Sequence, residues 1–172
     1  KTGIGLESTV LDLTTSRPTI LRPGGITFEQ LQALLKNLTI DKGILSTDAN
    51  IVPKSPGQKY KHYAPKGEMF LFVGDRDKVN ETIKEEIEKY QKLGKRIGLM
   101  VKEEDVPLFK SAIVKSMGSS DEEVGQNLFG ILREFDNMGV DVILSQVVDN
   151  SGIGFAVINR MMKASGGKIV QV

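Results

Sequence analysis

The residues best suited to chemistry lie in one short basic segment, from Ser55 to Pro65, which contains the single histidine of the chain. The segment, SPGQKYKHYAP, interleaves lysines with aromatic rings between two prolines. Alternate residues of an extended segment point in opposite directions, so Tyr60 and His62 can face one side while Lys59 faces the other. Cations beside stacking rings suit the phosphates and base of a nucleotide. The alternative is a basic linker that merely docks on a domain surface.

A second candidate group lies at the ends of two expected strands near the start of the chain. Glu7, Ser8 and Thr9 open the first strand, and Arg22 ends the second, directly before Pro23. A hairpin would bring the two hydroxyls and the guanidinium to one edge. The planar fork of an arginine suits a phosphate or a carboxylate. The same residue types are also common at strand ends without any function.

A glycine-rich turn, Gly152-Ile153-Gly154, follows an expected strand and opens a helix, which is the context in which such turns hold phosphates. A dinucleotide fingerprint would need another glycine where Val157 stands, and it belongs in the first βα turn of a sheet rather than the last. We therefore interpret the turn as a tight strand-to-helix connection with Asn150 or Ser151 near the cap. The acids at 121–123 are likewise interpreted as complementing a helix dipole rather than forming a metal or acid–base site.

The pattern after residue 66 supplies a scaffold for these groups. Short apolar runs alternate with amphipathic stretches, which is typical of parallel βαβ units. Right-handed crossovers place the helices of such units on both faces of the sheet. We predict an α/β fold, a Rossmann-like open parallel sheet, in which Arg160 on the last helix is solvated or bridges to another domain. The expected strands are 69–73, 96–101, 112–115, 142–145 and 168–172, and the expected helices are 77–93, 103–110, 121–138 and 154–165.

The first part of the chain shows a different pattern. Two strands, at 7–14 and 18–22, precede a helix that should run from Phe28 to about Leu38, with Thr27 and Gln30 forming a capping box. Leucines recur on one face of that helix, so it must pack on something larger than two strands. These leucines are Leu31, Leu34, Leu35 and Leu38. The predicted domains are residues 1–40, which end a first domain, an interdomain linker at 41–66, and a C-terminal domain at 67–172.

Composition excludes several classes of protein. With 40% hydrophobic and 26% charged residues among 172, the chain is typical of a globular protein. A net charge of +1 creates no overall field for a nucleic-acid or membrane partner. The absence of cysteine and the single histidine exclude disulfides and multi-histidine metal sites, and they favour a cytoplasmic location. No apolar run reaches the length of a membrane span.

Three ordered motifs together resemble the two-domain form of threonylcarbamoyl-AMP synthase. They are GLESTVLD at 5–12, ILRPG at 20–24 and the basic segment at 55–65. The resemblance continues to GFAVINR at 154–160 and so covers nearly the whole chain, while the N-terminal part of the family is absent. It implies that residues 1–40 end a YrdC-type α/β catalytic domain, and we expect the chain to be a fragment.

The resemblance implies an enzyme, an L-threonylcarbamoyladenylate synthase, that condenses L-threonine, bicarbonate and ATP to threonylcarbamoyl-AMP and pyrophosphate. This nucleotidyltransferase reaction is the first step toward threonylcarbamoyladenosine in tRNA, and it requires no direct binding of tRNA. ATP is a substrate, and Mg²⁺ would help to hold its triphosphate. By similarity, Ser8 would lie near threonine, and Arg22 and Tyr60 near the nucleotide. The linker, with Lys59 and His62, would close over the site as a lid and exclude water.

The main catalytic segment of the family would precede Lys1, so we assign no catalytic residue or metal ligand here and expect the chain by itself to be inactive. Two alternatives stay open. One is a non-catalytic nucleotide- or RNA-binding module that uses Gly152-Ile153-Gly154 and the basic linker. The other is a regulatory interaction domain that opens or shuts the lid. Exposed apolar strand edges in an incomplete domain also lead us to expect self-association.

Overall fold

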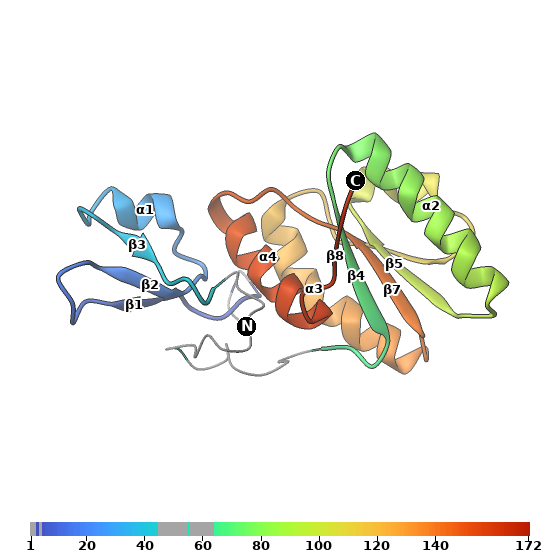
Figure 1. The fold of residues 1–172 in the computed structure, drawn as a ribbon, viewed down its shortest axis with the longest axis horizontal. Helices are drawn as coiled ribbons and strands as arrows, with labels where there is room; N and C mark the ends of the chain where they lie inside the picture. The colour runs from blue at the N-terminus through green and yellow to red at the C-terminus, as the bar shows by residue number, and fades with distance from the viewer. Residues whose placement is uncertain (1–2, 4, 45–54, 56–63) are drawn as a thin grey trace.

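The computed structural model describes residues 3, 5–44, 55 and 64–172, whose strands form two sheets (Figure 1). The smaller sheet has the order β1-β2-β3. Strand β1 (Val10–Asp12) pairs antiparallel with β2 (Thr19–Arg22), and β3 (Thr39–Ile40) pairs parallel with the other edge of β2. The first two strands therefore form the predicted hairpin.

The larger sheet has five strands in the order β6-β5-β7-β4-β8, and every neighbouring pair is parallel. Its central strands β5 and β7 are buried along their whole length because helices cover both faces. The strands are β4 (Glu68–Val73), β5 (Ile97–Val101), β6 (Ile113–Ser116), β7 (Val142–Gln146) and β8 (Ile169–Gln171). All five lie within two residues of their predicted positions.

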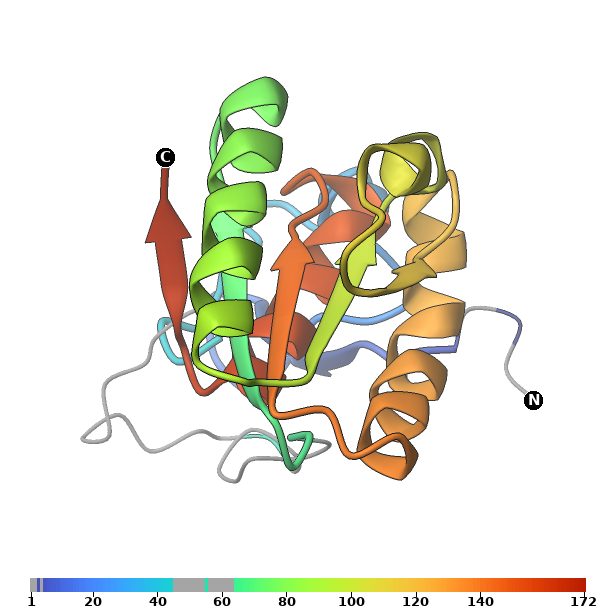
Figure 2. The same ribbon diagram turned by 90° about the vertical axis from the view of Figure 1, so that its right-hand side faces the viewer.

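Helix α2 (Arg76–Lys92) covers one face of this sheet, and α3 (Asp121–Asn137) and α4 (Gly152–Ser165) cover the other, as Figures 1 and 2 show. Two apolar clusters correspond to the two layers. The first includes Ile83 with Leu99, and the second includes Leu128, Phe135 and Ile143. The predicted α/β class, a parallel sheet with helices on both faces, is confirmed.

Glu123, one of the acids at the start of α3, caps the helix, which supports a structural role at the helix start over a metal or acid–base site. The Ser120 hydroxyl accepts a hydrogen bond from the Glu123 backbone N–H at 3.3 Å, and the Glu123 carboxylate accepts one from the Ser120 N–H at 3.3 Å. This capping box satisfies two backbone donors that the first turn of a helix leaves without intrahelical partners.

The predicted helix from Phe28 to Leu38 is wrong in length. Helix α1 (Phe28–Gln32) has the expected capping box of Thr27 and Gln30, but it ends at Gln32, and Asn37 takes a left-handed conformation with φ of 58°. The chain turns there because β3, which the sequence analysis missed, pairs beside β2. Leu31, Leu35 and Leu38 still pack in one cluster with Ile20 and Ile44, whereas Leu34 is 81% exposed.

The segment predicted as a helix at 103–110 is a 3₁₀ helix, η1 (Glu103–Leu108). Pro107 lies inside it and has no backbone N–H to extend an α-helical ladder. Within the described ranges, no helix combines the length and apolar character needed to cross a membrane.

Candidate functional site

The hairpin of the small sheet brings Ser8 and Arg22 together, as predicted. Ser8 lies just before β1 and Arg22 ends β2. The Arg22 Nε donates to the Ser8 carbonyl oxygen at 3.1 Å, and an Nη atom of Arg22 contacts the Ser8 hydroxyl at 3.4 Å. The hydroxyl expected to face an amino acid and the guanidinium expected to face a phosphate thus lie side by side at one edge of the sheet.

The other hydroxyl of this group has a structural role. Thr9 Oγ1 donates to the Ile26 carbonyl at 2.7 Å and accepts from the Ile26 N–H at 3.1 Å. These bonds fasten the chain after β2 against the segment before β1. Gly24 lies in the same contact, and a Cβ atom there would overlap the backbone of Glu7 and Thr9. The pair of segments that carries Ser8 and Arg22 is therefore closely packed, and glycine is the residue that fits.

A residue from the large domain holds this edge in place. The Arg160 side chain of α4 is 7% exposed, and its Nε donates to the Glu7 carboxylate at 2.6 Å. One Nη atom donates to the Pro23 carbonyl at 2.9 Å, and the other donates to the Asn159 side-chain oxygen at 2.7 Å. Because Glu7 precedes Ser8 and Pro23 follows Arg22, the guanidinium fixes both segments at once.

The electrostatics of this contact favour the ionised pair. Burial raises the pKa of Glu7, but the hydrogen bond and charge of Arg160, with a backbone hydrogen bond and the charge of Arg22, together lower it more, so the pKa lies below its ordinary value. A charged, hydrogen-bonded pair in which one partner is buried is strongly orienting. Arg160 is thus a bridging arginine, one of the two roles that the sequence analysis allowed for it.

More of α4 faces the small sheet. Asn159 Nδ2 donates to the Ile44 carbonyl, and Phe155 packs on a cluster of Ile20, Leu38 and Ile44. Sequence reasoning did not assign these contacts or the role of Glu7. A usable signal was present, because Phe155 and Asn159 are four residues apart and therefore share a face of the helix.

The glycine-rich turn opens α4 and is explained by contacts within the protein. Ser151 is the N-cap residue, although its side chain accepts no capping hydrogen bond. A Cβ atom at Gly154 would overlap the Asp149 carbonyl, and the Gly152 N–H points at the Glu29 carboxylate at 3.4 Å. This geometry supports the interpretation of a tight strand-to-helix turn.

The other candidate ligands lie outside the described residues. These are Lys59, Tyr60 and His62 of the basic linker. Their predicted contacts with a nucleotide, and the predicted closing of the linker over the site, stay predictions.

The described residues define a class of protein: an α/β domain of parallel strands whose last helix anchors the end of a second, smaller sheet. A family model described as "Threonylcarbamoyl-AMP synthase, C-terminal domain" matches residues 26–166. The chain belongs to this family, and the resemblance stated from the three motifs is confirmed.

Two curated relatives and one solved structure show how far the similarity extends. Threonylcarbamoyl-AMP synthase of Pyrococcus abyssi is 40% identical over 172 residues, covering 100% of this chain and 49% of the relative. The enzyme of the same name from Bacillus subtilis is 40% identical, covering 99% and 48%. A crystal structure of P. abyssi Sua5 complexed with L-threonine matches with a TM-score of 0.91 at 40% identity, covering 100% of this chain and 49% of that one. The chain spans about half the length of the curated relatives it matches.

Proposed function

We propose that this chain is part of an enzyme that forms threonylcarbamoyl-AMP and pyrophosphate from L-threonine, bicarbonate and ATP, and that the product serves threonylcarbamoyladenosine formation in tRNA. Membership of the family and the names of the relatives support this assignment. Because the product can diffuse to a later enzyme, the proposal includes no direct binding of tRNA. The proposed place of the reaction is the cytoplasm.

The reaction is a displacement at phosphorus. The amino nitrogen of threonine forms a bond to the carbon of bicarbonate, a C–O bond breaks and water leaves, and a carbamate results. An oxygen of this carbamate then forms a bond to the α-phosphorus of ATP. The bond from that phosphorus to the oxygen bridging toward the β-phosphate breaks, and pyrophosphate leaves with the electron pair. Positioning and stabilisation of charge carry most of such a transfer.

The observation that carries the proposal is the contact between Arg22 and Ser8. A hydroxyl that binds threonine and a guanidinium that binds nucleotide phosphate must lie close together, because the carbamate attacks the α-phosphate directly. The two side chains meet at hydrogen-bonding distance, at one edge held by Arg160. The solved P. abyssi structure is a complex with L-threonine, which adds support for a threonine site in this family.

The metal expected from the resemblance gains no support from the described residues. In residues 3, 5–44, 55 and 64–172, no group of three or more histidine or acidic side chains gathers that could hold a metal ion.

The linker residues complete the proposal. Tyr60 is assigned to the nucleotide, and Lys59 and His62 to a cover that keeps water from the reactive mixed anhydride. The division into residues 1–40, 41–66 and 67–172 is part of the same proposal, with the chemistry at the first unit and the cover between the two.

Pyrophosphate release is the direct test. We expect this 172-residue chain to show no threonine-dependent release, and a longer chain that carries the preceding part of the relatives ahead of Lys1 to show it. In the longer chain, Ser8→Ala should raise KM for threonine about 10- to 100-fold, and Arg22→Lys should lower kcat/KM for ATP about 100-fold because the planar fork is lost. Arg17→Lys, in the exposed turn between β1 and β2, is the matched control.

Threonine-dependent turnover by the 172-residue chain would contradict its expected inactivity. Titration of ATP against this chain and against residues 67–172 distinguishes the synthase from a nucleotide-binding module. Binding that the shorter chain retains in full would favour the module.

A further inference from the structure

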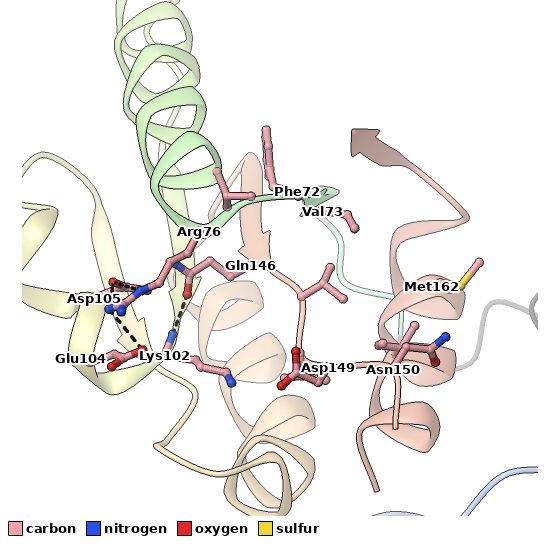
Figure 3. A pocket seen from close by; sticks show the side chains of 15 residues that line it. Phe72, Val73, Arg76, Lys102, Glu104, Asp105, Gln146, Asp149, Asn150 and Met162 are labelled. Carbon is pink, nitrogen blue, oxygen red and sulfur yellow. Dashed lines mark hydrogen bonds and ion pairs between the residues drawn. The ribbon is translucent and has the colours of Figure 1, made fainter. Parts of the chain in front are cut away.

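A cavity of about 610 Å³ lies at the carboxyl ends of three neighbouring strands of the large sheet, far from Ser8 in the sequence (Figure 3). It lies between the ends of β4, β5 and β7 and is flanked by α2 and α4. The connection after β4 leaves toward one face of the sheet, and the connection after β7 leaves toward the other. In open α/β sheets, ligands bind in the crevice at such a reversal.

The walls of the cavity are apolar and come from both layers of the domain. Phe72 at the end of β4 and Val79 of α2 belong to one hydrophobic cluster, and Ile158 and Met162 of α4 pack on the other. Val148, in the loop after β7, also lines it. Opposed apolar walls with a few polar groups are the usual lining of a site for a small ring-containing molecule.

One side of the cavity is a saturated polar network. The Asp105 carboxylate, 2% exposed, accepts from Arg76 at 2.6 Å, from Gln146 at 2.7 Å and from Asn80 at 3.2 Å. The Gln146 side-chain oxygen accepts from the Lys102 backbone N–H at 2.9 Å. These groups have already found their partners, so they make the wall rigid rather than supply ligand contacts.

The polar groups at the rim are different. In the described part of the chain, the Asp149 carboxylate has no hydrogen bond or ion pair, and the Asn150 side chain has no hydrogen bond, although both line the cavity. The Lys102 ammonium reaches only a distant contact with Asp121, at 3.8 Å. Figure 3 shows Lys102 and Asp149 pointing toward each other from the ends of β5 and β7. The rim therefore offers a carboxylate acceptor and an amide.

The charge of the lining disfavours a strongly anionic ligand. Three carboxylates, those of Glu104, Asp105 and Asp149, outnumber the two cations Arg76 and Lys102. Asp121 lies 3.8 Å from the Lys102 ammonium, and the pKa of its carboxyl is raised by burial, lowered by the charge of Lys102 and raised by that of Asp149. A phosphate would enter a region that already has an excess of negative charge.

We propose that this cavity binds an uncharged nucleoside. The flat base lies between the walls of Phe72 and Val79 on one side and Ile158 and Met162 on the other. The ribose hydroxyls donate to the Asp149 carboxylate, and the Asn150 amide pairs with a polar edge of the ligand. A carboxylate is the usual protein partner of a ribose diol in sheets of this kind. The site is separate from the proposed synthase site, and its ligand carries no phosphate to transfer.

Calorimetric titration of the 172-residue chain with adenosine, AMP and ATP tests the proposal. We expect saturable binding of adenosine in the micromolar range, at least 10-fold weaker binding of AMP, and weaker binding still of ATP, because each phosphate adds negative charge beside Asp149. Met162→Trp, which fills the cavity without changing its charge, should abolish adenosine binding. Glu85→Gln on the exposed face of α2 is the control and should leave the affinity unchanged.

A second variant tests the role of the carboxylate. Asp149→Asn should weaken adenosine binding at least 10-fold and narrow the difference between adenosine and AMP. Because the Asp149 side chain is exposed and makes no hydrogen bond or ion pair with the described residues, this variant should keep the unfolding temperature of the parent chain. Absence of adenosine binding up to millimolar concentration, equal or tighter binding of AMP, or unchanged affinity in Asp149→Asn would each overturn the proposal. None of these results depends on pyrophosphate release, so the synthase assignment can fail or hold independently.

Discussion

The Arg160 guanidinium lies 2.6 Å from the Glu7 carboxylate, although 153 positions separate the two residues in the chain. The contact joins the last long helix of the large domain to the residue before Ser8. The same guanidinium reaches the carbonyl of Pro23, the residue after Arg22. The position of the candidate substrate-binding edge thus depends on a residue from the other end of the protein.

Replacement of Arg160 by methionine should destabilise the protein by about 1–3 kcal/mol, because it leaves the half-buried Glu7 carboxylate and the Pro23 carbonyl without their hydrogen-bond donor. The free energy of unfolding, measured by urea denaturation, checks this prediction. Arg133→Met, an exposed arginine of α3, is the matched control and should change stability by less than about 0.5 kcal/mol. Equal effects of the two substitutions would show that the bridge contributes nothing.

The Glu7 pair also predicts a pH dependence. The pKa of Glu7 is lowered in the folded state, so its ionised form contributes stability above the ordinary glutamate pKa of about 4.3, and this contribution is lost as the pH falls through the lowered value. Glu7→Gln should therefore be less stable than the parent chain at pH 7, and the difference should shrink below about pH 4.3. Denaturant unfolding at several pH values measures it, and a difference independent of pH would contradict the assignment.

The Asp105 network gives a third prediction. Asp105→Ala removes the shared acceptor of Arg76, Asn80 and Gln146 and should cost about 1–3 kcal/mol, because the buried amides of Asn80 and Gln146 each lose a hydrogen bond. The neighbouring Glu104, whose side chain is 59% exposed, also pairs with Arg76. Glu104→Ala should cost at most about 1 kcal/mol. Thermal unfolding of the two variants side by side measures the contrast.

Two glycines predict opposite effects of the same substitution. Gly24→Ala would place a Cβ atom against the backbone of Glu7 and Thr9 and should destabilise by about 1–3 kcal/mol. Gly130 lies inside α3 with open space at its Cβ position, so Gly130→Ala should stabilise by about 0.5–1 kcal/mol. A loss of stability at Gly130, or none at Gly24, would show that the packing described here is wrong.

The large sheet could be predicted because each of its strands is a short apolar run with its own boundary signals. The strand β3 could not be predicted, because two residues are too few to show the alternation of apolar and polar side chains. Thr39–Ile40 is a strand only through its pairing with β2. The predicted length of α1 was wrong for the same reason, namely a pairing that the local sequence does not indicate. Regularly spaced leucines favoured a longer helix, but pairing with β2 requires the chain to turn at Asn37.

The sequence predicted only those contacts of the candidate site whose residues lie close together along the chain. A hairpin was enough to bring Ser8 beside Arg22, because the two residues are 14 positions apart across one turn. The bridge from Glu7 to Arg160 joins residues from opposite ends of the chain, so no regular spacing of residues in the sequence indicates it. One sequence pattern did indicate the network around Asp105. Arg76 and Asn80 are four residues apart at the start of a helix and therefore share a face.

Two faces of helix α4 make different contacts. Phe155, Asn159 and Arg160 contact the segments of the small sheet. Ile158 and Met162 line the cavity. Substitutions along this short stretch should therefore give one of two phenotypes, depending on which face of the helix carries the changed residue. A random library confined to α4 would then map two separate phenotypes, loss of synthase activity and loss of ligand response, onto neighbouring codons.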